Sequence, residues 1–572
     1  MSRKNKNQLP REPEFATNLK LLDMAYGGEC VARLEEVPGS KFQVPSLGEE
    51  SLSSEKEGLS SEKESSRFQP VGRVSALEEV IEPPIATEFN SGEVVEAENS
   101  YNLELETQNL KPEHPVVFVA GGLPGETVDV QLYRRKKSYL RGNVTRLLEI
   151  SPDRREAPCP WFGIDKWPNC GGCQWQHADY AAQLAYKAGI LRDQLIRLGG
   201  LENPPLLAPV EARSAWAYRN NVEFQVDRAT GRPCYHRQNS IRLVPVESCH
   251  IAHPLINLAI EPLALALAQH LPGKVHQVTV RVGPVVADSP IAAEEITALA
   301  PYNQDEAARL AALERFGAVA PLELALNAKR PVLMLILRML GEADLAPFVA
   351  DMQTALDRYA ELTIIGEGKK RRLDLRCGPA YLEEVLDGIT YRVPPLAFFE
   401  SNSAMAEELV YQVFEAFEAA GLKWRGSRLL DLFCGVGTFS LQMAKRGAQV
   451  QGIEEYEGAT QAATENARLN QLEKQTEFVA ARAEEYILEL EQRGEVFDGV
   501  LLDPPRRGCD PALLESLLKT RPPALVYVSC DPSTLARDIK LLSSGYRLVR
   551  SRVIDLFPQT YHMESVSLLM LI

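Results

Sequence analysis

The stretch that decides the fold is Arg428-Leu-Leu-Asp-Leu-Phe-Cys-Gly-Val-Gly-Thr438. Its first half has the apolar pattern of a buried strand, and its two glycines predict a turn that leads into a helix. From about residue 401, helical and strand patterns alternate to the end of the chain. Such alternation is typical of a doubly wound sheet, so residues 401–572 are predicted to form a Rossmann-like α/β domain. The expected elements are helices 402–420, 438–446, 457–470, 483–493, 511–518 and 532–542, and strands 427–433, 448–454, 476–480, 498–502, 524–529, 546–556 and 565–571.

The N-terminal third has a different pattern. Short strand-like runs separated by glycine turns predict a small antiparallel β-barrel of the TRAM or OB type over residues 1–155. Residues 38–113 interrupt it with a Glu- and Ser-rich stretch that contains a near duplication, Leu52-Ser-Ser-Glu-Lys-Glu57 and Leu59-Ser-Ser-Glu-Lys-Glu64. Because this composition buries little apolar surface, a disordered insertion is predicted there. Residues 156–400 read as a central α+β domain, with a possible further insertion at 285–322.

Composition narrows the class of protein. At 572 residues and 45% hydrophobic content, the chain is long enough for more than one core. No apolar run approaches the ~18 residues of a membrane span, and no apolar signal segment follows the basic N-terminus. We therefore expect a cytoplasmic protein with no membrane partner. In that compartment the ten cysteines are expected to be thiols, metal ligands or nucleophiles.

The net charge of −16 is unevenly distributed. Residues 40–114 alone contain 16 Glu against 6 Lys or Arg. Directly afterwards comes a basic stripe with interleaved tyrosines, Tyr133-Arg-Arg-Lys-Lys-Ser-Tyr-Leu-Arg141, followed by Arg146, Arg154 and Arg155. Such a stripe suits a phosphate backbone, although a solvated strand face is an equally good interpretation of a short charge run.

Polar groups follow three of the predicted strands. Gly435 and Gly437 allow close approach of a ligand to a helix N-terminus, and Glu454 ends the next strand, where it can accept hydrogen bonds from ribose hydroxyls. A third strand ends in Asp503-Pro-Pro-Arg-Arg-Gly508. This resembles the Asp-Pro-Pro-aromatic loop of amino-methyltransferases, but Arg506 holds the aromatic position. The pattern predicts a nucleoside-containing cofactor and a target other than an amino group.

A thiol and a carboxylate complete the candidate catalytic set. Cys530 ends the strand Ala524-Leu-Val-Tyr-Val-Ser-Cys530, where a parallel sheet presents residues to ligands. Near the C-terminus, Phe557-Pro-Gln-Thr-Tyr-His-Met-Glu564 leads into the last strand. His562 and Glu564 are two residues apart, so both can face one cleft as acid or base.

Four further cysteines lie outside this domain. Cys159, Cys170, Cys173 and Cys249 give the spacing C-x10-C-x2-C-x75-C, with two glycines inside the C-x2-C. Four thiolates suit an iron–sulfur cluster or a tetrahedral zinc ion, and the spacing alone does not choose between them.

Together these motifs resemble the RNA uracil-5-methyltransferases, and most closely the 23S ribosomal RNA members with a TRAM barrel and a [4Fe–4S] cluster. The resemblance implies S-adenosylmethionine (SAM) as methyl donor and a uridine in RNA as acceptor. The sequence indicates no obligate protein partner. By position, it implies Cys530 as nucleophile and Glu564 as base. The same match implies cofactor contacts from Glu400, Phe433, Thr438, Glu454 and Asp503, and cluster ligation by Cys159, Cys170, Cys173 and Cys249.

The chain departs from the family pattern at several positions. Glu400 stands where the family usually has Gln, Thr438 replaces a common Asn, and the first cysteine gap is about five residues longer. Four alternative functions stay open: a transfer RNA uracil-5-methyltransferase, an amino-methyltransferase, a cytosine methyltransferase, and a non-catalytic RNA-binding or assembly factor.

Overall fold

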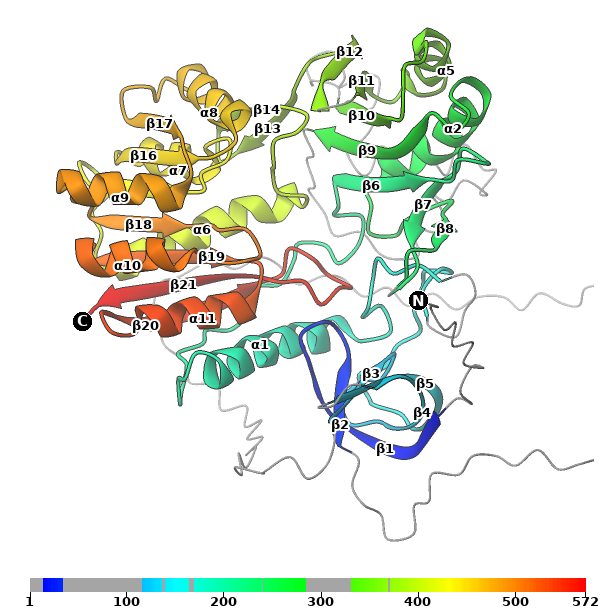
Figure 1. Cartoon of the computed structure of the whole chain (residues 1–572), viewed down its shortest axis with the longest axis horizontal. Helices are drawn as coiled ribbons and strands as arrows, with labels where there is room; N and C mark the ends of the chain where they lie inside the picture. The colour runs from blue at the N-terminus through cyan, green and yellow to red at the C-terminus, as the bar shows by residue number, and fades with distance from the viewer. Residues whose placement is uncertain are drawn as a thin grey trace, which may run out of the picture. The chain divides into compact units, whose positions relative to one another are not determined.

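The computed structural model describes residues 14–33, 116–135, 139–163, 169–238, 240–283, 331–368 and 371–572. Within them lie a closed barrel, a seven-stranded central sheet, a two-stranded hairpin and a seven-stranded C-terminal sheet (Figure 1). The expected insertions at 38–113 and 285–322 lie wholly outside the described residues. None of the helices in the described part of the chain is long and apolar enough to cross a membrane.

The N-terminal barrel closes in the order β1-β2-β3-β5-β4. Its strands are β1 (Glu14–Met24), β2 (Cys30–Arg33), β3 (Val116–Ala120), β4 (Thr127–Arg135) and β5 (Tyr139–Glu149). The stretch outside the described residues falls between β2 and β3, which pair directly, so the barrel closes across it. The predicted small barrel is thereby confirmed, but it is not wholly antiparallel, because β3 and β5 pair in parallel.

Four arginines at and after the end of the basic stripe are described, and the role of the stripe in RNA binding stays a prediction. Arg141, Arg146, Arg154 and Arg155 each form an ion pair with an acidic side chain, at 3.4, 2.7, 2.5 and 3.2 Å respectively. Their charge is therefore largely balanced within the protein. Residues 136–138 and the side chains of Arg134 and Arg135 lie outside the described part.

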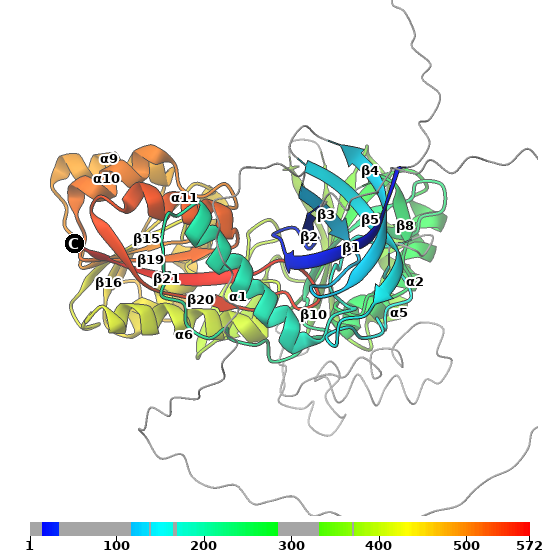
Figure 2. The same ribbon diagram turned by 90° about the horizontal axis from the view of Figure 1, so that it is seen from below.

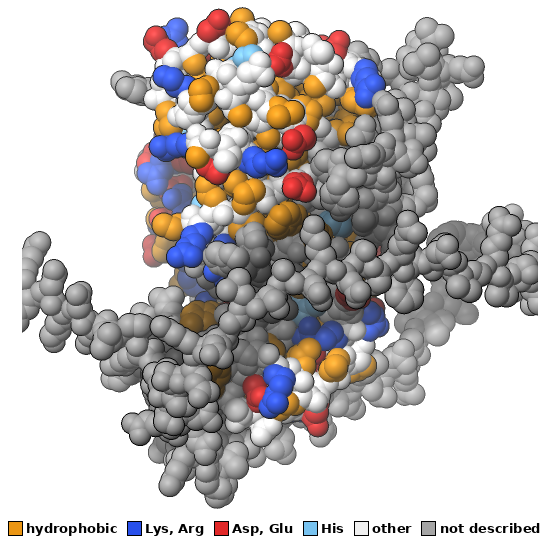
Figure 3. All heavy atoms as spheres, turned by 90° about the vertical axis from the view of Figure 1, so that its right-hand side faces the viewer, with side chains coloured by type: hydrophobic (Ala, Val, Ile, Leu, Met, Phe, Trp, Pro, Cys, Tyr) orange, Lys and Arg blue, Asp and Glu red, His pale blue; other side chains and the backbone are white. Residues whose placement is uncertain are grey.

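The central sheet has the order β12-β11-β10-β9-β6-β7-β8. Its strands are β6 (Asn221–Val226), β7 (Pro233–His236), β8 (Leu243–Pro245), β9 (Val275–Gly283), β10 (Val332–Met339), β11 (Glu361–Glu367) and β12 (Leu373–Cys377). Helices α2 (Pro254–His270) and α5 (Ala346–Leu356) share one apolar core with this sheet. On the face seen in Figure 3, the described Lys and Arg side chains are interspersed with acidic and hydrophobic ones.

The C-terminal sheet has the order β17-β16-β15-β18-β19-β21-β20, and only β21 (Glu564–Leu571) runs antiparallel to its neighbours. Its other strands are β15 (Arg428–Leu432), β16 (Gln449–Glu454), β17 (Thr476–Ala480), β18 (Gly499–Leu502), β19 (Ala524–Ser529) and β20 (Tyr546–Ile554). Every strand and helix expected after residue 401 is present, with boundaries within two residues. The doubly wound prediction is confirmed.

Helices cover both faces of this sheet, as Figure 2 shows, with α6 on one side and α9, α10 and α11 on the other. The helices are α6 (Ser403–Ala419), α7 (Thr438–Lys445), α8 (Glu457–Leu469), α9 (Ala483–Arg493), α10 (Pro511–Thr520) and α11 (Pro532–Leu542). Pro511 and Pro532 lie in the first turns of α10 and α11, and the preceding Asp510 and Asp531 accept hydrogen bonds as N-caps. These are favourable helix starts directly beyond strand ends.

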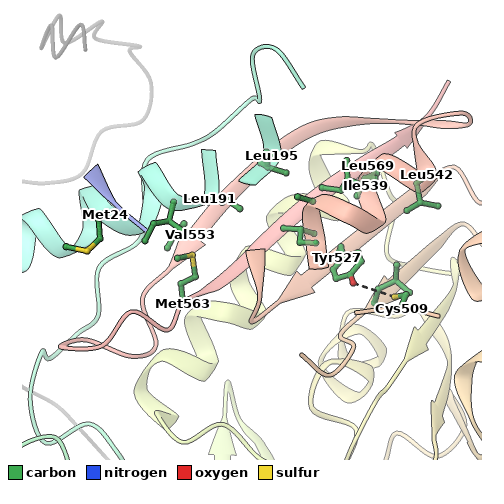
Figure 4. Packing of buried hydrophobic residues seen from close by; sticks show 14 of the residues in the cluster. Met24, Leu191, Leu195, Cys509, Tyr527, Ile539, Leu542, Val553, Met563 and Leu569 are labelled. Atoms are coloured by element: carbon green, nitrogen blue, oxygen red, sulfur yellow. Dashed lines mark hydrogen bonds between the residues drawn. The ribbon is translucent and has the colours of Figure 1, made fainter. Parts of the chain in front are cut away.

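Two elements before residue 401 also pack on the C-terminal domain. Leu191 and Leu195 of α1 (Tyr180–Arg197) lie in one apolar cluster with Val553 of β20 and Met24 of the barrel (Figure 4). The hairpin β13 (Leu382–Leu386) and β14 (Ile389–Val393) shares a core with α7 and α8. The catalytic sheet is therefore supported by chain segments from both other regions.

Candidate active site

Strand pairing brings the thiol and the carboxylate of the predicted catalytic pair together. The antiparallel register of β19 and β21 pairs Ser529 with Ser565, so its continuation by one residue places Cys530 opposite Glu564. The Ser565 hydroxyl donates to the Ser529 carbonyl at 3.3 Å, and Glu564 also pairs with Ile554 of β20. Glu564 is held between two strands and is only 7% exposed.

Both residues line a cavity of about 470 Å³ at the carboxyl ends of the parallel strands. Four of the five predicted cofactor residues line it as well: Glu400, Phe433, Glu454 and Asp503. His562, predicted to face the same cleft as Glu564, also lines the cavity, as does Arg506 of the Asp503–Gly508 loop. Further lining side chains are Phe398, Ile453, Glu484, Pro504, Arg507, Phe557 and Met563. Phe398 is 71% exposed, so an aromatic ring stands at its rim.

Thr438 is the predicted cofactor residue that does not line the cavity. It is the first residue of α7, and its carbonyl accepts a hydrogen bond from Tyr391 at 2.9 Å. Thr438 thus begins the helix that follows the glycine turn, as the sequence predicts, while its contact with the cofactor stays a prediction.

The glycine turn shapes the cofactor end of the cavity. Phe433 adopts a φ of +71°, a left-handed conformation unusual for a non-glycine residue, and Gly437 follows with φ +86°. A side chain at Gly437 would lie 3.2 Å from the ring of Phe478, so glycine also provides space. The Gly435 and Tyr456 amides donate to the two carboxylate oxygens of Glu454, at 3.1 and 2.8 Å. The turn and the acidic residue therefore form one unit.

The cavity concentrates buried carboxyl groups. Burial raises the pKa of Glu400 to about 7 and that of Asp503 well above its usual range, with Glu400 and Asp431 adding to the effect at Asp503. Burial likewise raises the pKa of Glu564, with further contributions from Glu400 and Asp503 and an opposing one from Arg506. Because these acids disfavour one another's charge, the cavity is suited to a cationic ligand.

Cys530 is a protonated thiol in this environment. Burial raises its pKa to about 12, Glu564 adds to the rise, and Arg506 opposes it. Arg506 Nη2 lies 3.2 Å from Nδ1 of His562. Since arginine donates, Nδ1 is the acceptor, and burial together with Arg506 lowers the pKa of His562 to about 3. His562 is thus neutral at pH 7.

The barrel contributes a residue that the sequence did not reveal. Tyr26, in the β1–β2 turn, donates a long hydrogen bond of 3.5 Å to the Cys530 carbonyl. Its ring contacts Tyr561 edge-on at 5.5 Å, and Tyr561 packs against His562 at 4.2 Å. A separation of 504 positions leaves no local signal for this contact.

The four cysteines predicted as metal ligands line a second cavity of about 240 Å³, together with His250. They are Cys159, Cys170, Cys173 and Cys249. The Gly172 amide donates to Cys170 Sγ at 3.3 Å, and burial raises the pKa of the Cys170 thiol to about 12, with Cys249 and Cys159 adding to it. No three His, Cys, Asp or Glu side chains in the described ranges are grouped so as to hold a metal ion. The thiols thus face one space, but a metal centre is not established by this geometry.

The C-terminal sheet and its helices have the Rossmann-like fold that SAM-dependent methyltransferases share. The chain superposes on the Pyrococcus abyssi tRNA (uracil-54, C5)-methyltransferase, solved in complex with S-adenosyl-L-homocysteine, with a TM-score of 0.56. That match has 24% sequence identity and covers 79% of this chain and 95% of the other. At this identity the likeness concerns the fold.

Sequence relatives are more specific. Residues 332–571 match the tRNA (uracil-5-)-methyltransferase family. An uncharacterized RNA methyltransferase of Gloeobacter violaceus is 33% identical over 473 residues, which covers 79% of this chain and 91% of the relative. The Shewanella amazonensis 23S rRNA (uracil(1939)-C(5))-methyltransferase RlmD is 32% identical, with coverage of 80% and 91%. This chain belongs to the RNA uracil-5-methyltransferase family, as the motifs predicted.

The charges around Cys530 give a test of the site geometry. Because the thiolate is the reactive form, Cys530 in the folded, ligand-free protein should react with iodoacetamide at least about a hundredfold more slowly at pH 8 than in the urea-unfolded chain. Glu564→Gln removes the acid that raises the pKa of Cys530 and should speed the reaction, whereas Arg506→Ala removes the group that lowers this pKa and should slow it further. Peptide mass spectrometry measures the labelling. Equal or faster labelling in Arg506→Ala would contradict the arrangement.

Proposed function

We propose that this enzyme methylates C5 of a uridine in RNA through a covalent intermediate between Cys530 and C6 of the base. The observation that carries the proposal is the β19–β21 register, which places Cys530 opposite Glu564 at the edge of a cavity that also holds the cofactor residues. Nucleophile and base are thus presented to the same ring by one strand pair. The amino-methyltransferase alternative lacks its aromatic residue after Pro505.

The chemistry requires both groups. Uracil C5 is too weak a nucleophile to take a methyl group directly, so the Cys530 thiolate first adds at C6 and creates an enolate with electron density at C5. C5 then attacks the methyl group of SAM, and S-adenosylhomocysteine leaves. Glu564 removes the C5 proton, and β-elimination releases Cys530. Arg506, which lines the cavity, or nearby backbone N–H groups would stabilise the developing charge on O4.

The acidic cavity supports the assignment of the cofactor residues. SAM carries a positive sulfonium and a positive α-ammonium group, which balance the charges of Glu400, Glu454 and Asp503. An added positive charge lowers the pKa of neighbouring acids and of a thiol. SAM binding would therefore favour the Cys530 thiolate, which burial and Glu564 disfavour. Phe433 supplies an apolar surface, and Thr438 lies at the helix start.

We propose 23S ribosomal RNA as the substrate. The support is the 32% identity with RlmD over 80% of this chain, which is far more than residues 401–572 alone. Because a duplex hides C6, the target uridine must be unpaired or flipped out. Transfer RNA is the second candidate, since both the matched family and the structural neighbour carry that substrate in their names.

We further propose that Cys159, Cys170, Cys173 and Cys249 ligate a [4Fe–4S] cluster. The four thiols line one cavity of about 240 Å³, as the ligands of a single centre would. The choice of an iron–sulfur cluster over a tetrahedral zinc ion rests on the family resemblance. The Gly172 amide to Cys170 is a hydrogen bond of the kind that tunes such clusters. A cluster would cross-link the segment that contains Cys159, Cys170 and Cys173 to the segment that contains Cys249. We assign it this structural role because the methyl transfer requires no electron.

The roles of the catalytic pair can be separated. Glu564→Gln should still form the adduct but fail to resolve it, so a denaturation-resistant protein–RNA complex accumulates while turnover falls by about 10²–10⁴-fold. Cys530→Ala should form no complex, even with 5-fluorouridine RNA. Gel electrophoresis and tritium transfer from SAM measure both. Cys509→Ala, a buried cysteine outside the cavity, is the matched control. Normal methylation by Cys530→Ala would exclude covalent catalysis.

The substrate can be identified by mass spectrometry of treated RNA. Incubation with 23S rRNA and with transfer RNA lacking modifications should yield 5-methyluridine at one site in 23S rRNA, with transfer RNA modified at least about tenfold more slowly, equivalent to 1.4 kcal/mol of barrier. Preferential modification of transfer RNA would reverse the substrate assignment. Formation of 5-methylcytidine would overturn uridine as the target.

Metal analysis tests the cluster. Protein purified without oxygen should hold about four iron and four sulfide per chain, and Cys170→Ser should lose most of both. Cys377→Ser, in β12 and outside the cavity, should keep them. One zinc ion per chain in place of iron would show that the cysteines form a mononuclear site.

A further inference from the structure

The loop between β20 and β21, residues 555–563, forms one wall of the catalytic cavity. Phe557, His562 and Met563 of this loop line the cavity, and Glu564 begins the strand that follows. The loop contains a non-glycine residue with positive φ, Gln559, at +67°. Such a conformation is unfavourable and persists only where the surroundings enforce it.

The cysteine-bearing segment, residues 169–177, contacts Gln559 through its backbone. The amides of Gln174 and Trp175, the first two residues after Cys173, both donate to the Gln559 carbonyl, at 3.1 and 3.0 Å. Two donors on one carbonyl fix the peptide plane at the position with unusual φ. This contact links a predicted cluster ligand to the wall of the active site through one or two residues.

Helix α1 completes the enclosure of Gln559. Gln183 Nε2 donates to Gln559 Oε1 at 3.0 Å, while Gln183 Oε1 accepts from the Gln559 amide at 2.9 Å. The same Nε2 also donates to the carbonyls of Trp175 and Ala178, at 3.1 and 3.0 Å. Gln183 and Gln559 are 0% and 3% exposed, so water does not replace these bonds.

Neighbouring contacts hold the rest of the loop. Lys187 of α1 is fully buried and pairs with Asp555 at 2.6 Å, and it also donates to the Phe557 carbonyl at 3.0 Å. Tyr218 donates to the Pro558 carbonyl at 3.0 Å. Each partner comes from outside the C-terminal sheet, so the loop is shaped by segments that precede it by more than 300 residues.

We propose that segment 169–177 and Gln183 position the β20–β21 loop through Gln559, so that ligation of the cysteines acts on the reaction by fixing the wall against which the target base docks. Gln559 and Gln183 are positioning residues, since neither lines the cavity. The inference rests on the proposed function for its effect on RNA, but the coupling between segment and loop stands on the contacts alone. SAM binding should be independent of it, because Glu454 and Asp503 follow other strands.

Gln183→Met tests the positioning role, because methionine keeps the volume but neither donates nor accepts a strong hydrogen bond. Adduct formation with 5-fluorouridine RNA should slow about tenfold and the KM for RNA should rise, while the Kd for SAM stays within about twofold. Tyr546→Phe is the matched control. It removes a buried hydroxyl that donates to the Leu517 and Pro522 carbonyls, away from the loop, and should lower Tm without changing adduct formation.

Hydrogen exchange tests the coupling without RNA or SAM. Cys249→Ser leaves the 169–177 sequence intact but removes a proposed ligand, and chelation of iron from the wild-type protein does so without a substitution. Both should make peptides covering 555–563 exchange about tenfold faster, with β19 peptides as the reference for global opening. Faster exchange in 169–177 with no change in 555–563 would overturn the coupling. Loss of adduct formation in the wild-type protein would instead overturn the proposed function.

Discussion

The antiparallel pairing of β19 with β21 is the interaction on which the site depends. Every other neighbour pair on the β17 to β19 side of the sheet is parallel, and parallel strands present their ends at one edge. An antiparallel strand instead begins where its neighbour ends, so Glu564 enters the sheet beside Cys530. A shift of one residue would turn the side chains of β21 to the opposite face and remove the base from the thiol.

Electrostatics give this arrangement its chemical character. Burial and the neighbouring Glu564 together raise the pKa of Cys530 to about 12, so its unreactive thiol form is favoured. Burial also raises the pKa of Glu400, Asp503 and Glu564, which favours their protonated forms. A cationic cofactor relieves both conditions at once. Under the proposed function, a methyl donor that carries positive charge would favour the thiolate of Cys530, which is the nucleophile that the acceptor base needs.

Residues from outside the catalytic domain help to hold the residues around the catalytic cavity in place. Tyr26 from the barrel, Lys187 and Gln183 from α1, and the amides after Cys173 all contact residues between Cys530 and Glu564. The buried Lys187–Asp555 pair is costly to desolvate and strongly destabilising if only one partner is removed. Such contacts make the relative placement of the regions part of the active site. In and directly after the barrel, four arginines form ion pairs with acidic side chains of the protein itself. They are Arg141, Arg146, Arg154 and Arg155.

The sequence by itself determined the order of strands and helices after residue 401, the small barrel, and the candidates Cys530, Glu564, Glu454 and Asp503. These were readable because apolar periodicity and residues at strand ends are local properties. Only the tertiary structure decided that Thr438 lies off the cavity and that Tyr26 and Gln559 belong to the site's surroundings. It likewise decided the ion pairs of Arg141, Arg146, Arg154 and Arg155. Contacts across hundreds of residues depend on how sheets and helices pack, and no local pattern encodes them.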